Sequence, residues 1–156
     1  MDAKQYQTKF EAYLLTEKRV SHNTFAAYQH DIRQFVYFLR TEHNTDITNA
    51  SREQIKSFLH HLSSQGLSAR SLSRKISSLK ILYTYLHTYH GLENRCDDLI
   101  FPKLEKRLPR YLREDEIELL FAVADRDQTP LGVRNKVMLY LLYVSGMRIS
   151  ELIHLT

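Results

Sequence analysis

The sequence predicts an all-α fold. Its 156 residues include only 4 glycines and 3 prolines and no tryptophan, a composition that argues against a turn-rich all-β protein. Apolar residues recur with the period of about 3.6 residues that is typical of amphipathic helices. Cys96 is the only cysteine, which excludes an internal disulfide framework and a cysteine-cluster metal site. The charged N-terminus lacks the apolar core of a signal peptide, and no apolar run reaches the roughly 18 residues of a membrane span.

Two helices are expected before residue 45. The first covers residues 2–19 and the second covers residues 24–42, with Ser21 or Asn23 as the N-cap of the second. The second helix places one apolar residue per turn on a single face. This face contains Phe25, Tyr28, Ile32, Phe35 and Leu39.

Two more helices are expected before residue 92. The third begins at Ser51, which fits a capping box with Gln54 at the N3 position. The fourth covers residues 69–89, with Ser68 as its N-cap and Gly91 at its end. Its apolar stripe is the clearest in the chain and contains Leu72, Ile76, Leu79, Tyr83 and Leu86.

A basic stretch bounded by prolines, residues 103–110, is interpreted as a linker between two domains. Pro102 and Pro109 disfavour helix in the residue before each of them. The first domain is therefore expected to span residues 1–102 and the second residues 111–156.

The second domain is expected to contain three helices, over residues 113–125, 130–145 and 149–155. Pro130 is suited to the first turn of its helix. Residues 137–144 are so apolar that this helix should be buried on most sides. The residues from 111 onward are too few to surround it, so we expect the second domain to be incomplete.

The charge distribution is uneven, although the net charge is only +4. Residues 54–92 contain no acidic residue, and residues 103–113 contain Glu105 alone. The two stretches carry the cations Lys56, Arg70, Arg74, Lys75, Lys80, Lys103, Lys106, Arg107, Arg110 and Arg113. Stretches of one sign favour a surface that faces phosphates, and chance clustering is the alternative.

The fourth helix is the first candidate for DNA binding. At about 100° per residue, Arg70, Arg74 and Ser77 project from the side opposite its apolar stripe. Lys75 and Lys80 flank the stripe, where their stems can pack while their charges reach water. Arginine can bridge phosphates or guanine edges, and serine can bind a phosphate. A solvated basic face is the alternative.

The start of the second helix is another candidate. Asn23 and Thr24 lie at a helix N-terminus, where unpaired N–H groups and the helix dipole favour a phosphate. A purely capping role for these two residues is the alternative. The nearby string from His30 to Arg33 reads H-x-x-R, but it lies inside a helix and is interpreted as coincidence.

Arg148 is the candidate for chemistry in the second domain. It follows the helix-ending Gly146 at the edge of an apolar helix, so we expect it to be partly buried and to need a partner. Glu151, three residues on, can supply that partner on one helical face. A simple salt bridge at a helix start is the alternative. The histidine pairs of the chain lack carboxylate or cysteine partners at metal spacing, so no metal site is expected.

Four segments resemble the sequence boxes of the tyrosine recombinases, the lambda-integrase family. Residues 144–152, Val-Ser-Gly-Met-Arg-Ile-Ser-Glu-Leu, closely resemble the first arginine box. Residues 23–31 resemble the N-T-x-x-x-Y-x-x-D signature, residues 67–86 resemble the third hallmark, and residues 108–112 resemble the P-x-x-L start of the catalytic domain. The boxes keep the family's order and spacing across essentially the whole chain, and the pattern is most similar to the Xer group.

This resemblance implies a helical, SAM-like core-binding domain followed by the first helices of an incomplete α+β catalytic domain. It implies site-specific recombination, in which a tyrosine attacks a phosphodiester of duplex DNA to give a 3′-phosphotyrosyl link without metal or nucleotide cofactor. Arg148 would bind the scissile phosphate and Glu151 would orient Arg148. The candidate DNA-binding residues are Asn23, Thr24, Arg70, Arg74, Lys75, Ser77, Lys80, Lys103, Arg107 and Arg110.

The family's remaining catalytic residues follow the arginine box, so we expect a C-terminally truncated chain that binds DNA without cleaving it. The resemblance implies chromosome dimer resolution in the bacterial cytoplasm, by a tetramer with itself or a sister recombinase on two DNA sites, with a septal DNA translocase as a further partner. The alternatives are an integrase or transposase of a mobile element, a DNA-binding module without catalysis, and a helical protein-interaction domain.

Overall fold

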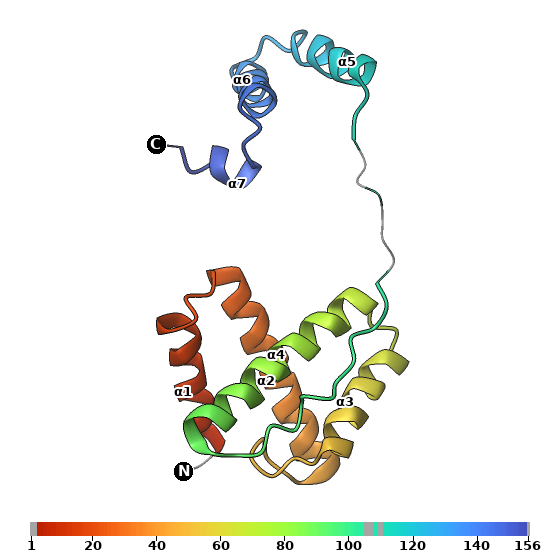
Figure 1. The fold of residues 1–156 in the computed structure, drawn as a ribbon. Coiled ribbons are helices and arrows are strands. Elements are labelled where there is room, and N and C mark those ends of the chain that lie inside the picture. The colour runs from red at the N-terminus through yellow and green to blue at the C-terminus, as the bar shows by residue number, and fades with distance from the viewer. Residues whose placement is uncertain (1–2, 105–107, 109–110, 156) are drawn as a thin grey trace. The chain divides into compact units, whose positions relative to one another are not determined.

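The computed structural model describes residues 3–104, 108 and 111–155. The chain divides into two compact units, residues 1–105 (unit 1) and residues 106–156 (unit 2). The described residues form seven helices and no strand, which confirms the predicted all-α fold for this part of the chain (Figure 1). None of the helices in these ranges has the length and apolarity that a membrane span requires.

Unit 1 is a bundle of four helices (Figure 1). Their bounds are α1 Ala3–Thr16, α2 His22–His43, α3 Arg52–Ser64 and α4 Ala69–His90. The predicted capping box between Ser51 and Gln54 is present, and Ser68 caps α4 as predicted. Of the two alternatives for α2, Ser21 is the N-cap. The first helix ends earlier than predicted, before Arg19, whose φ of 46° is incompatible with helix.

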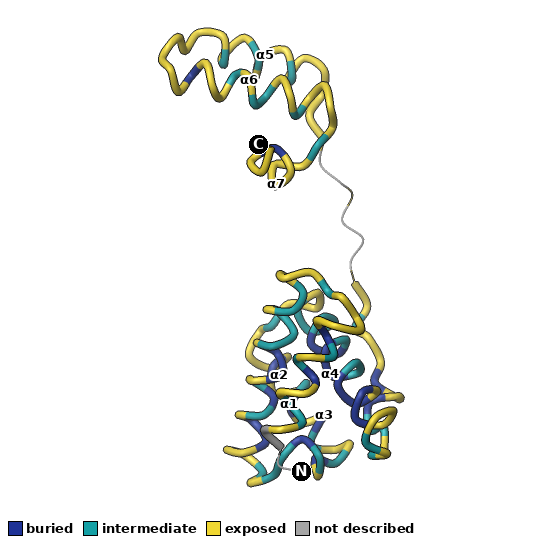
Figure 2. Tube along the Cα trace, turned by 90° about the vertical axis from the view of Figure 1, so that its left-hand side faces the viewer, coloured by how far each residue is buried: buried dark blue, intermediate teal, exposed yellow. Residues whose placement is uncertain are grey.

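The core of unit 1 lies where the four apolar faces meet, and Figure 2 shows the buried positions concentrated there. Aromatic rings connect α2 to α3, because the Phe58 ring lies 5.1 Å from that of Phe35 and 5.2 Å from that of Phe38, centroid to centroid. The Tyr83 hydroxyl donates to the Ile47 carbonyl at 2.9 Å, so the largest buried side chain also satisfies a backbone acceptor.

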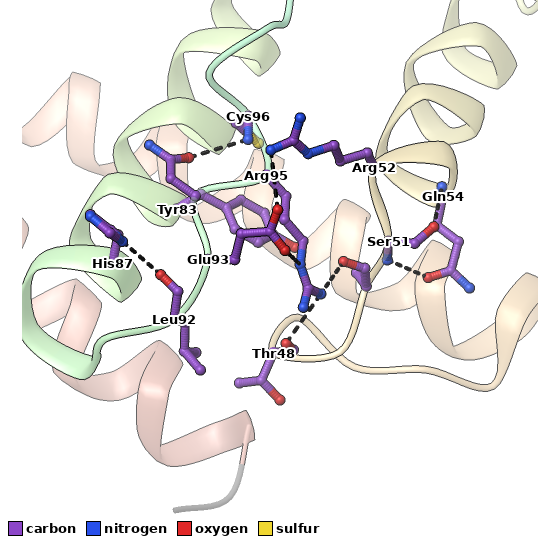
Figure 3. A network of polar contacts seen from close by, with 12 residues as sticks. Thr48, Ser51, Arg52, Gln54, Tyr83, His87, Leu92, Glu93, Arg95 and Cys96 are labelled. Atoms are coloured by element: carbon purple, nitrogen blue, oxygen red, sulfur yellow. Dashed lines mark hydrogen bonds and ion pairs between the residues drawn. The ribbon is translucent and has the colours of Figure 1, made fainter.

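After α4, residues 92–101 run back along the bundle past α4 and α3, and we call them the return segment (Figure 1). Cations hold it in place. Arg52 of α3 pairs with Glu93 at 3.1 Å, and Lys56 pairs with Asp98 at 2.9 Å. Arg95 donates to the carbonyl of Ala50 at 2.5 Å. It also donates to the carbonyl of Thr48 at 3.4 Å (Figure 3). The return segment is therefore part of the packed unit up to its final residues.

Unit 2 contains α5 Glu114–Ala124, α6 Pro130–Ser145 and α7 Ile149–Leu152. Thr129 caps α6 with Pro130 in its first turn, and Gly146 ends it at a φ of 65°, as predicted. The third helix of unit 2, α7, ends at Leu152 and is therefore shorter than the expected range of 149–155.

The apolar helix α6 is not enclosed within unit 2, which agrees with the expectation that the residues from 111 onward are too few to surround it. The Phe121 ring of α5 stacks on Tyr140 of α6 at 4.4 Å, but the other faces of α6 meet no further element of unit 2 except α7. Val144 is 81% exposed, and Figure 2 shows α5 and α6 with few buried positions. One helix, α5, and the short turn of helix α7 are too few to enclose α6.

Candidate nucleic-acid interface

The helices α2 and α4 begin in the same way. Ser21 accepts a hydrogen bond from the backbone N–H of Thr24 at 3.3 Å, and the two hydroxyl groups lie 2.9 Å apart. Ser68 accepts from the N–H of Ser71 at 3.2 Å, with the hydroxyl groups 3.0 Å apart. Each helix start thus presents two small hydroxyl groups at the positive end of a helix dipole, a combination that suits a phosphate.

Arg74 connects the two helix starts. Its Nη1 donates to the Ala27 carbonyl of α2 at 3.1 Å and to the Asp31 carboxylate at 2.5 Å. The second turn of α4 therefore lies against the second turn of α2. The sequence predicts that Arg74 projects away from the core, but the side chain leans onto α2 and is 38% exposed.

Lys75 differs from its prediction. Its ammonium donates to Asp31 at 2.8 Å and to Gln34 at 2.6 Å, and the side chain is 4% exposed. The expectation that the Lys75 charge reaches water is wrong, because α2 supplies a buried carboxylate directly opposite it. We call Asp31, Gln34, Arg74 and Lys75 the Asp31 cluster.

Two other cations of residues 54–92, Lys56 and Lys80, also find partners outside that stretch. Lys56 pairs with Asp98, and Lys80 donates to the Asp97 carbonyl at 3.3 Å while its ammonium lies 5.2 Å from the Phe101 ring centroid. Arg70, in the first turn of α4, is exposed and forms no ion pair with any described residue. The stretch therefore presents less positive surface than its composition indicates, and its free charge is concentrated at the start of α4.

The remaining candidates fall into three groups. Asn23 is exposed in the first turn of α2, and Lys103 is exposed near the end of unit 1. Ser77 is half-buried, and its hydroxyl donates to the Ser73 carbonyl one turn earlier at 3.0 Å. Arg107 and Arg110 lie outside the described residues.

In unit 2, Arg148 is the N-cap of α7 and is bound by Glu151 in two places. Its backbone N–H donates to Glu151 Oε2 at 2.8 Å, and its Nη1 donates to Oε1 at 2.9 Å. The backbone hydrogen bond, followed by the guanidinium contact, lowers the pKa of the Glu151 carboxyl. The predicted pairing is present. The predicted partial burial is wrong, because the short helix α7 leaves the Arg148 side chain 82% exposed.

The described residues contain no group of three or more histidine, cysteine or acidic side chains that could hold a metal ion. Among the candidate residues that the structure describes, the arginines are exposed at the start of α4 (Arg70), anchored between α2 and α4 (Arg74) and paired with a carboxylate in unit 2 (Arg148). Guanidinium groups at helix starts bind phosphates, so the candidate ligand is a nucleic-acid backbone.

Two family models match this chain in the same order as the two units. The model of the phage integrase N-terminal SAM-like domain matches residues 8–89, more than half of the chain, and the phage integrase family model matches residues 110–156. The chain belongs to the tyrosine recombinase family. The helical bundle of unit 1 accordingly corresponds to the SAM-like domain of this family.

The curated relatives of this chain include Xer proteins. The chain is 36% identical over 156 residues to tyrosine recombinase XerC of Bacillus subtilis (strain 168), covering 99% of this chain and 51% of that protein. It is 34% identical over 152 residues to tyrosine recombinase XerD of Rickettsia prowazekii (strain Madrid E), covering 97% and 49%. The chain thus spans about half the length of these relatives. A crystal structure of XerA recombinase matches with a TM-score of 0.50 at 23% identity, covering 81% of this chain and 42% of that one, and supports the fold alone.

Sequence reasoning missed the role of Asp31 in this chain. The residue belongs to the N-T-x-x-x-Y-x-x-D signature, but the signature does not say which residues it contacts. A polar residue directly beside the buried Ile32 was the available signal, because a buried carboxylate requires a cation. The anchoring of the return segment by Arg95 could not be predicted either, because its acceptors are backbone carbonyls, which every residue carries.

Proposed function

We propose that this chain is part of a site-specific DNA recombinase and that unit 1 binds duplex DNA through the starts of α2 and α4. The observation that carries the proposal is the joining of the two serine-capped helix starts by Arg74. Arg70 lies exposed on the first turn of α4 and has no ion pair with a described residue. Membership of the tyrosine recombinase family supports the proposal.

The two helix starts offer complementary contacts to a DNA backbone. Arg70 brings a full charge, and Arg74 brings a guanidinium that is held on one side. Asn23 and Thr24 bring side-chain polar groups beside the N–H groups of the first turn of α2. Such contacts set the position of a protein on the duplex, and arginines that reach the major groove read guanine. Lys103, Arg107 and Arg110 would add backbone contacts, whereas Lys75 serves the packing of α2 on α4.

Arg148 would act on the scissile phosphate of the complete recombinase. In the proposed reaction a tyrosine oxygen attacks phosphorus, the bond from phosphorus to the 5′ oxygen breaks, and the leaving 5′ oxygen takes up a proton. Negative charge develops on the non-bridging oxygens, and an arginine held ready by Glu151 stabilises it. Because the resemblance places the nucleophile after the arginine box, we propose that residues 1–156 alone bind DNA without cleaving it.

We propose chromosome dimer resolution in a bacterial cytoplasm as the biological role, because the relatives described above are XerC and XerD proteins. The active assembly would be a tetramer of this protein with itself or a sister recombinase on two DNA sites, with a septal DNA translocase as a further partner. The match to phage integrase models favours a mobile-element integrase or transposase as the second candidate.

Fluorescence anisotropy with labelled duplex DNA over a series of salt concentrations tests DNA binding. Phosphate-driven binding weakens linearly in log K against log salt, with a slope of about −0.9 for each phosphate contacted. The same mixtures, run on a denaturing gel, report covalent attachment. No binding at low salt contradicts DNA binding, and a covalent protein–DNA band contradicts the proposed inactivity.

A further inference from the structure

We propose that Asp31 is a positioning residue for DNA binding, which holds one edge of the Arg74 guanidinium so that the opposite edge faces a phosphate. The inference rests on the proposed DNA-binding function of unit 1. It concerns a residue that lies too deep in the bundle to touch DNA itself, since the Asp31 side chain is 1% exposed.

The hydrogen bonds of Arg74 are divided unequally around its guanidinium. Nη1 carries two N–H groups, and it donates to two acceptors, the Ala27 carbonyl and Asp31 Oδ2. Nε and Nη2 carry the other three N–H groups, and no described residue accepts from them. The Nε hydrogen and one Nη2 hydrogen project from one shared edge of the planar group, the edge that can bind two oxygens of one phosphate. Asp31 thus occupies the inner side of Arg74 and leaves the outer edge free.

The charge balance of the cluster preserves the charge of Arg74. Asp31 supplies one negative charge, and both Lys75 and Arg74 donate to it, through different carboxylate oxygens. Gln34 takes a further N–H of the Lys75 ammonium and is neutral. The cluster therefore has a net charge of +1, because the buried Lys75 ammonium neutralises the buried Asp31 carboxylate. Arg74 is oriented by an anion without losing its attraction for a phosphate.

A double-mutant cycle over Asp31→Asn and Arg74→Ala in the 156-residue chain tests this inference. If Asp31 acts through Arg74, Asp31→Asn weakens DNA binding about fivefold while Arg74 is present, and by less than about twofold once Arg74 is alanine. A role in overall packing predicts equal losses in both backgrounds. An effect of net charge predicts tighter binding for Asp31→Asn, since an anion is removed. Either result overturns the inference.

The orientation of Arg74 has a readout that does not involve DNA. A guanidinium held at Nη1 rotates slowly, so its Nη hydrogens give separate signals in ¹⁵N–¹H NMR spectra at low temperature. We expect these signals for Arg74 in the wild-type chain and their averaging in Asp31→Asn. Averaged signals in the wild type overturn the inference.

Two controls keep the outcomes distinct. Lys56→Met removes a cation that is ion-paired on α3 and should leave DNA binding within about twofold, since its contact is with the return segment. If Asp31→Asn does not fold, the cycle is repeated with Lys75→Met in all four proteins. This change removes the buried ammonium, which has no counter-ion once Asp31 is asparagine. A wild-type chain that does not bind DNA overturns the proposed function and this inference together. Additive losses overturn this inference alone.

Discussion

The ammonium of Lys75 lies 2.8 Å from the carboxylate of Asp31, and both side chains are almost fully buried. Asp31→Ala would leave this ammonium with Gln34 as its only other partner among the residues that the structure describes. Loss of one member of a buried ion pair destabilises a protein by about 3–5 kcal/mol, so we expect Asp31→Ala to lower the free energy of unfolding by about that amount. Urea unfolding followed by circular dichroism measures it.

Removal of both charges provides the comparison for this prediction. Asp31→Asn combined with Lys75→Met leaves no buried charge and should recover most of the lost stability. Lys56→Ala breaks the exposed pair with Asp98 and should change the free energy of unfolding by less than about 1 kcal/mol. If Asp31→Ala proves no more destabilising than Lys56→Ala, the Asp31 cluster does not hold α2 to α4.

The helix boundaries could be predicted from the sequence because caps are local. The bond from Gln54 N–H to Ser51 joins residues three apart, and the same holds for Ser68 and Ser71. A short polar string is therefore enough to place a helix start. The pairing of cations could not be predicted in this way.

Lys75 and Asp31 are 44 residues apart in the sequence, and Lys56 and Asp98 are 42 apart. Only the crossing of α2 with α4 and the course of the return segment bring these pairs together. Residues 54–92 lack acidic side chains, but the fold supplies acidic partners from outside that range. Helical periodicity placed Arg70 correctly on the exposed side of α4, yet it could not show that Asp31 draws Arg74 onto α2.

Arg70 is the exposed cation from which we expect the largest single contribution to DNA affinity. Arg70→Ala should weaken DNA binding about threefold to tenfold and reduce the slope of log K against log salt by about 1, as for the loss of one phosphate contact. It should leave the urea midpoint unchanged, because the side chain has no ion pair with any described residue. Fluorescence anisotropy and urea unfolding measure the two quantities.

Arg40→Ala is the matched control for Arg70→Ala. Arg40 is also exposed on a helix, but it lies in the last turn of α2, far along that helix from its capped start. We expect its removal to change affinity by less than about twofold. Equal losses for the two variants would show that binding follows net charge rather than the starts of α2 and α4.

Cys96 is buried in the return segment, and burial raises the pKa of its thiol to about 12. At pH 8 such a thiol holds about one thiolate in ten thousand molecules, whereas a free cysteine of pKa about 8.5 holds about a quarter. We expect alkylation of the native chain to be slow and limited by opening of unit 1. Mass spectrometry after iodoacetamide treatment follows the reaction, with full labelling in concentrated guanidinium chloride as the control. Rapid labelling of the native chain would show that the return segment is not packed.

The contact between Arg148 and Glu151 should persist well into the acid range. The backbone N–H of Arg148 and its guanidinium lower the pKa of the Glu151 carboxyl in the folded chain. The folded chain therefore stabilises the ionised carboxylate relative to the unfolded chain. The contribution is therefore complete above the ordinary glutamate pKa of about 4.3 and is lost as the pH falls below it, through the lower folded-state pKa. NMR titration of the Glu151 side-chain carboxyl carbon measures this pKa, and Arg148→Ala should return it toward the ordinary value. A wild-type titration at or above about 4.3 would mean that Glu151 does not hold Arg148 in solution, and the arginine would then reach a phosphate without a prepared orientation.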